Sequence, residues 1–226
     1  MHEESPLKKT LLNIQSEQKL DQLEQFKDQE KWNELAESDL DLLANLFIKK
    51  GMLDVNKNRN LGLDEFHTAL KITGYSPDTY LKIAKAWMHL SEWDEAERAI
   101  EEGLKKAPEH LEILIESATI SLNRGSQERK EEHLIEALER FEKARKIHPE
   151  LSTEGYYRWG KACFILARLS QEPCDFLTAI EKFKTAENLG SNDKHLFFDH
   201  ALAVADLTSY VSRVEHIHES LLYLLK

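Results

Sequence analysis

Residues 76–110 read SPDTYLKIAKAWMHLSEWDEAERAIEEGLKKAPEH, and this stretch decides the fold. Ala84 and Ala96 are small residues in two successive helical segments, and their size lets two helices cross closely. Trp87 is one of the large side chains that would fill the space around that crossing. Pro108 cannot continue a helix, so the chain turns there. The stretch therefore predicts an antiparallel helix pair that ends in a turn.

The same stretch resembles the tetratricopeptide repeat. The family pattern places an aromatic residue, a small residue and a second aromatic residue on the first helix, then Ala and Phe on the second helix, then Pro. Residues of the expected class fill these places in order: Tyr80, Ile83, Ala84, Trp87, Ala96, Ile100, Gly103 and Pro108. The resemblance implies an all-α fold, an α-solenoid of stacked antiparallel helix hairpins in a right-handed superhelix.

Two later blocks repeat the pattern with a longer period. Four pairs of matching residues lie 42 residues apart: Ala118 and Gly160, Ala137 and Ala179, Phe141 and Phe183, and Ala144 and Ala186. The family period is about 34 residues, and the small residues inside each long hairpin lie 19 residues apart instead of 12. The seven extra residues, in 126–132 and 170–176, are expected to form extended tips or helices about two turns longer.

We divide the chain on this pattern. A flexible N-terminal tail is expected at 1–15 and an N-terminal capping helix at 16–37. The array is expected over 38–226, in blocks at about 38–75, 76–110, 111–151, 152–192 and 193–226. The residues expected at the buried hairpin crossings are Ala84, Ala96, Ala118, Ala137, Gly160 and Ala179.

Composition narrows the function. The 226 residues carry a formal charge of −11, which repels phosphate backbones and argues against nucleic-acid binding. No stretch has the apolar length of a membrane span. Cys163 and Cys174 lack metal or redox spacing, which favours reduced thiols in a cytoplasmic protein. No nucleophile–base or cofactor motif is present, so neither an enzyme, a cofactor nor a metal site is expected.

One segment competes with the repeat pattern. Residues 54–66, DVNKNRNLGLDEF, resemble an EF-hand calcium loop. Its oxygen ligands would be Asp54, Asn56, Asn58, Asn60 and Glu65. Arg59 stands at the sixth position, where the calcium loop uses glycine for a sharp turn. A calcium-modulated adaptor is therefore the alternative, and an Asn-rich hairpin turn is the favoured interpretation.

The resemblance also implies a concave groove lined by first helices. Groove positions carried over from the family are Leu81, Lys85, Met88, Ile115, Thr119, Tyr157, Lys161, Phe164, Phe198 and Leu202. Because most are apolar, the expected ligand is an apolar or amphipathic segment of a partner protein. The alternative is a groove filled by the chain's own N-terminal residues or by a second copy. Leu81 and Lys85 do not fit the family's clamp for acidic chaperone tails.

The sequence thus predicts a non-enzymatic protein-interaction module, either a scaffold or a co-chaperone. The end of the chain adds a second expectation, because Leu221, Leu222, Leu224 and Leu225 cover more than one side of a helix. Array ends need a polar outer face. Two alternatives follow: self-association through the C-terminal helix, or a chain that is a piece of a longer array.

Overall fold

The computed structural model describes residues 6–17, 19–27, 32–33 and 35–224, with side chains described over 8–15, 19–27, 32–33 and 35–215. Every regular element in these residues is helical, and no strand occurs among them. The chain divides into two compact units, residues 1–113 and 114–226. Each unit is described by itself.

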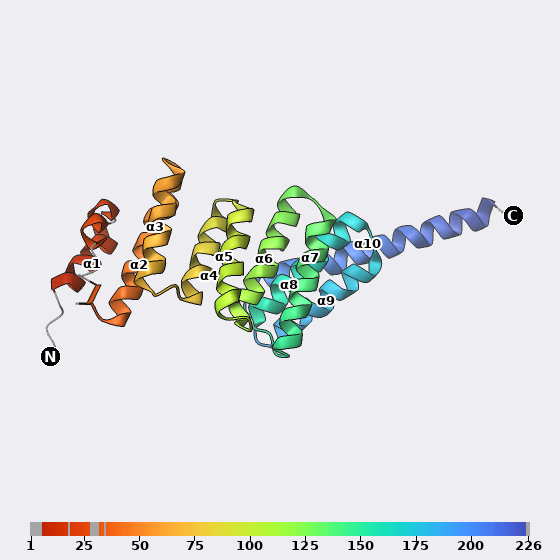
Figure 1. The fold of residues 1–226 in the computed structure, drawn as a ribbon. Helices are drawn as coiled ribbons and strands as arrows, with labels where there is room; N and C mark the ends of the chain where they lie inside the picture. The colour runs from red at the N-terminus through yellow and green to blue at the C-terminus, as the bar shows by residue number, and fades with distance from the viewer. Residues whose placement is uncertain (1–5, 18, 28–31, 34, 225–226) are drawn as a thin grey trace. The chain divides into compact units, whose positions relative to one another are not determined.

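The first unit contains two helix pairs and an N-terminal layer (Figure 1). Its elements are α1 (Pro6–Glu17), the 3-10 helix η1 (Leu20–Phe26), α2 (Glu37–Val55), α3 (Arg59–Ile72), α4 (Pro77–His89) and α5 (Trp93–Lys106). Helices α2 and α3 pack together, as do α4 and α5, and α1 and η1 pack on α2. Edge-on contact between the rings of Phe66 and Trp87, 4.9 Å apart, joins α3 to α4.

The N-terminal expectations need correction. The predicted flexible tail 1–15 contains helix α1, because Leu11 and Ile14 are buried and tie it to the unit. The predicted capping helix 16–37 is instead the short η1, followed by residues 32–33 in a second tight turn. Residues 1–5 of the expected tail lie outside the described residues.

The second unit is built from α6 (Leu111–Glu128), α7 (Glu131–Ile147), α8 (Thr153–Ser170), α9 (Pro173–Asn188) and α10 (Lys194–Leu224), the first of which begins in residues 111–113. Helix α8 packs on α7 and α9, and α10 packs on α9. The predicted last hairpin, 193–226, is wrong. Residues 194–224 form one helix, with no turn that would begin a second helix of the block. Side chains of Leu221, Leu222 and Leu224, and all of Leu225, lie outside the described residues.

The hairpin crossings are confirmed. All six small residues predicted there are buried: Ala84, Ala96, Ala118, Ala137, Gly160 and Ala179. Each lies on a helix that packs against its neighbour along the chain, and large apolar side chains such as Ile100, Phe141 and Phe183 are buried beside them. The all-α fold and its tetratricopeptide-like hairpins follow from this packing.

The seven-residue insertions lengthen helices instead of forming tips. Helices α6, α7, α8 and α9 have 18, 17, 18 and 16 residues, against 13 and 14 in α4 and α5. The turns that remain are two residues long and begin with a left-handed residue, Arg129 (φ 55°) and Gln171 (φ 62°). Glu, Lys, Arg and Gln are good helix formers, so the added residues extend both helices of each pair by about one turn.

We expect Ala96→Leu and Ala137→Leu each to lower the free energy of unfolding by about 1–3 kcal/mol, because the added atoms overpack a closed crossing. Chemical denaturation followed by circular dichroism measures the change. Glu101→Leu is the control for α5, since Glu101 is exposed on the same helix. If both alanine variants denatured at the same midpoint as the parent, the crossing assignment would be wrong.

Candidate functional site

Most of the predicted groove residues are not on an open surface. Leu81, Ile115, Thr119, Tyr157 and Phe164 are buried, Lys85, Met88 and Leu202 are half-buried, and only Lys161 and Phe198 are exposed. The apolar ladder that suggested a binding groove is therefore largely part of the core. Five of these residues therefore have little surface left for a partner, and the groove assignment stays a prediction.

The physical reason is the stacking of successive first helices in the second unit. Arg158 of α8 donates hydrogen bonds to Glu116 (2.9 Å) and Thr119 (3.1 Å) of α6. Burial disfavours the charged form of Arg158, but Glu116 and Glu154 outweigh it and raise the pKa of the guanidinium. In the next layer, the Tyr157 hydroxyl donates to Asp199 of α10 at 2.9 Å. Burial, and then this acceptor, raises the tyrosine pKa.

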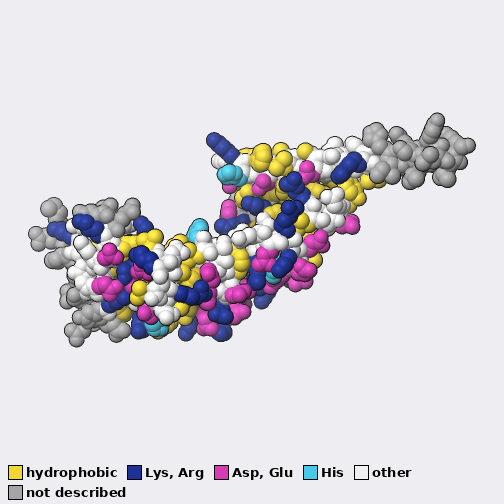
Figure 2. All heavy atoms as spheres, turned by 90° about the horizontal axis from the view of Figure 1, so that it is seen from above, with side chains coloured by type: hydrophobic (Ala, Val, Ile, Leu, Met, Phe, Trp, Pro, Cys, Tyr) yellow, Lys and Arg dark blue, Asp and Glu magenta, His cyan; other side chains and the backbone are white. Residues whose placement is uncertain are grey.

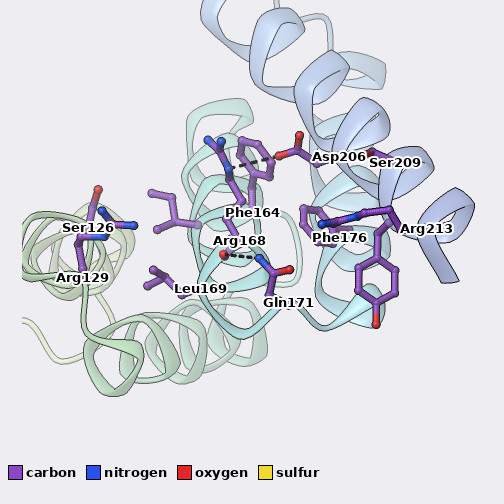
Figure 3. Close-up of a pocket in the computed structure, with 12 residues that line it drawn as sticks. Ser126, Arg129, Phe164, Arg168, Leu169, Gln171, Phe176, Asp206, Ser209 and Arg213 are labelled. Carbon is purple, nitrogen blue, oxygen red and sulfur yellow. Dashed lines mark hydrogen bonds and ion pairs between the residues drawn. The ribbon is translucent and has the colours of Figure 1, made fainter. Parts of the chain in front are cut away.

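A pocket of about 570 Å³ does open within the second unit. Its walls are the end of α6 with the turn after it, the second half of α8 with its turn, the first turn of α9 and the middle of α10 (Figure 3). Helices α6, α8 and α10, each the first helix of its repeat, thus contribute most of the lining, as the family resemblance implies. Phe164 is the one predicted groove residue that lines it.

Positive charge dominates the lining. The pocket carries three arginines, Arg129, Arg168 and Arg213, and a single carboxylate, Asp206. Arg168 Nε lies 3.3 Å from Asp206 Oδ2, which leaves two arginine charges without a carboxylate partner among the lining residues. A chain of net charge −11 therefore presents a locally basic pocket, and such a pocket attracts anionic groups.

Aromatic rings lie beneath two of these cations. The guanidinium of Arg168 is 5.5 Å from the ring centre of Phe164, and that of Arg213 is 5.9 Å from Tyr210. Phe176 adds a further ring to the wall, 6.3 Å from Phe164 (Figure 3). Stacking on a ring holds a guanidinium in place while its edge remains available for hydrogen bonds. The pocket can therefore contact a carboxylate and an apolar group together.

The family groove positions missed these residues, although the repeat register contains a signal for them. Ser126, Arg168 and Ser209 line the pocket, and they lie 42 and 41 residues apart, at the same place in three successive first helices. Ser126 lies in the last turn of α6 and Arg168 in the last turn of α8, and Arg129 lies in the turn after α6. The inserted segments 126–132 and 170–176 therefore supply part of the lining, namely Ser126, Arg129, Gln171 and Phe176.

The residues of the calcium interpretation adopt another arrangement. Asn58 caps α3, accepting a hydrogen bond from the Asn60 backbone N–H at 3.0 Å, and Arg59 is the first residue of the helix where a calcium loop would turn. Glu65 is buried and accepts hydrogen bonds from Lys50 (2.5 Å) and Lys27 (3.0 Å). The described residues contain no group of three or more His, Cys, Asp or Glu that could hold a metal ion.

Because two lysines already pair with Glu65, we expect calorimetric titration with CaCl2 to give no binding heat. Calcium concentrations up to about 1 mM cover the affinities of sensor-type sites. Addition of a chelator should leave the melting temperature unchanged. The matched control is Glu65→Gln, which should lower stability without altering the calcium response, because it leaves a buried lysine short of a charged partner. Saturable binding that Asp54→Asn abolishes would restore the calcium adaptor as the better interpretation.

The family model of the coatomer epsilon subunit matches residues 66–155, less than half of the chain. None of the curated proteins compared with the chain matches it.

Similar solved structures include a MamA fragment, residues 41 to the end, from Desulfovibrio magneticus RS-1, at 18% identity and a TM-score of 0.47, covering 75% of this chain and 93% of that one. A tetratricopeptide protein from Thermus thermophilus is 16% identical with a TM-score of 0.40, covering 72% and 99%. Pseudomonas aeruginosa PilF is 16% identical with a TM-score of 0.47, covering 74% and 72%.

Finally, among the residues that the structure describes, no helix combines the length and the apolar character needed to cross a membrane.

Proposed function

We propose that this protein is a protein-interaction scaffold, and that the pocket of residues 114–226 binds a partner segment carrying a carboxylate next to an apolar or aromatic side chain. The observation that carries the proposal is the lining itself: three arginines and one carboxylate over aromatic walls. The match of residues 66–155 to a subunit of coatomer, by name a component of an assembly, is consistent with a scaffold role.

The pocket changes the kind of ligand that the sequence suggested. An apolar ladder alone favours an apolar or amphipathic segment, but Leu81, Ile115 and Tyr157 are buried. Arg168 and Arg213 instead offer planar donors that match a carboxylate. A volume of about 570 Å³ is in the range of small-molecule sites, so the pocket would accept one or two side chains of a partner while the rest of the segment lies along the helices.

The proposal is tested with a fluorescein-labelled 12-residue peptide of Glu, Phe and Ser, and with a matched peptide in which Lys replaces Glu. We expect the Glu peptide to bind more tightly although the protein is acidic overall. The variant Arg168→Glu/Arg213→Glu should weaken this binding at least about tenfold, or about 1.4 kcal/mol. Fluorescence anisotropy measures both affinities.

Lys143→Glu is the matched control, because Lys143 is exposed on α7 and does not line the pocket. It changes net charge as each single arginine reversal does, so it measures the effect of overall charge alone. Equal affinity for the Glu and Lys peptides, or equal weakening by the control and by a single Arg213→Glu, would refute the assignment of the pocket.

A further inference from the structure

Helix α10 exposes the side that corresponds to the buried sides of α6 and α8, the first helices of the two preceding hairpins. Matching positions of α6, α8 and α10 are Ile115, Tyr157 and Phe198, and their exposed fractions are 7%, 9% and 61%. The crossing residues Ala118 and Gly160 are buried, whereas the matching Ala201 is exposed. Within the described residues, α10 is thus a first helix without the second helix that would complete its hairpin.

The exposed side is apolar and continuous. Phe197, Val204 and Val211 follow one another at seven-residue spacing and are 46%, 43% and 44% exposed. Ala201, Ala205, Thr208 and Ser212 lie between them and are exposed too. At 3.6 residues per turn these residues occupy about 120° of the helix circumference. Figure 2 shows hydrophobic side chains along this helix, on the arm that leads into the grey residues.

Among the described side chains of α10, two charged residues lie on this side. They are Lys194, the first residue of the helix, and Glu215, the last residue whose side chain is described, and both are exposed. The other charged or titratable residues between them lie outside this arc of the helix: His195, Asp199, His200, Asp206, Tyr210 and Arg213. Asp206 and Arg213 face the pocket, so the apolar side and the pocket use different sides of α10.

We propose that the apolar side of α10 pairs antiparallel with α10 of a second copy of this chain. In a two-fold symmetric pair the contacts are reciprocal: if residue i of one copy contacts residue j of the other, residue j of the first copy contacts residue i of the second. If Val204 lies opposite the second copy's Ala205, then Lys194 lies opposite the second copy's Glu215, and both ends form an ion pair.

Size complementarity supports the same register. The large Phe197 lies opposite the second copy's small Ser212, and Ala201 lies opposite the second copy's Thr208. In a parallel two-fold pair Lys194 would instead lie opposite the second copy's Lys194, which places like charges together. The paired stretch, 194–215, is about 33 Å long. Binding to a different protein would not require this side of α10 to be complementary to itself in charge and size, whereas pairing with a second copy does.

Sedimentation velocity of the full chain tests the pairing. We expect a monomer–dimer equilibrium over about 1–100 µM protein. Val204→Glu should raise the dimer dissociation constant at least about tenfold, because it places two charges at the centre of an apolar contact. Val204 is exposed, so circular dichroism should show an unchanged fold. His195→Glu adds the same charge to α10 outside this arc and should leave the dimer intact.

A charge exchange tests the register. Lys194→Glu and Glu215→Lys should each weaken the dimer about two- to tenfold, as expected for pairs at the edge of a contact. The double variant should return to within about twofold of the parent. A chain that stays monomeric at 100 µM overturns the proposal, as does a dimer that Val204→Glu leaves unchanged. Failure of the double variant to recover overturns the antiparallel register. None of these variants alters a residue lining the pocket, so this result is independent of peptide binding.

Discussion

The ring of Phe183 lies where any side chain on residue 160 would have to be. A Cβ atom added to Gly160 would come within 2.6 Å of the Phe183 ring, closer than carbon atoms approach without displacement. The ring is fully buried, so it has little room to move. This close approach fixes the separation and crossing of α8 and α9. At the other predicted crossings the small residue is a buried alanine: Ala84, Ala96, Ala118 and Ala137.

The crossings have consequences that reach the pocket. A hairpin closed at a small residue presents its first helix to the next first helix, and Arg158 and Tyr157 use that surface for partly buried hydrogen bonds. The lengthened ends of α6 and α8 carry Ser126 and Arg168, and the turn after α6 carries Arg129. All three residues line the pocket. The inserted segments thus supply part of the pocket lining, including Arg129. Helix α10 contributes the opposite wall, and its other side remains uncovered within the described residues.

The fold could be predicted from the sequence because its decisive residues are local and periodic. Small residues recurring at 34 and 42 positions identify the crossings, and the structure confirms their burial. The groove could not be predicted in the same way. A list of first-helix residues does not say how closely the next hairpin approaches, and here it approaches closely enough to bury Ile115 and Tyr157. Nor does the length of an insertion say whether it forms a loop or helix. The repeat pattern also predicted a hairpin over 193–226, where the structure has one helix over 194–224.

The interpretation of the crossings has a direct test in the sign of one stability change. Alanine normally stabilises a helix relative to glycine by about 1 kcal/mol. Because Phe183 occupies the space beside Gly160, Gly160→Ala should instead lower the free energy of unfolding, and urea denaturation followed by circular dichroism measures it. A loss of stability is the result that tight crossing predicts. A gain of about 1 kcal/mol, as in an open helix, would show that α8 and α9 are not held together at this residue.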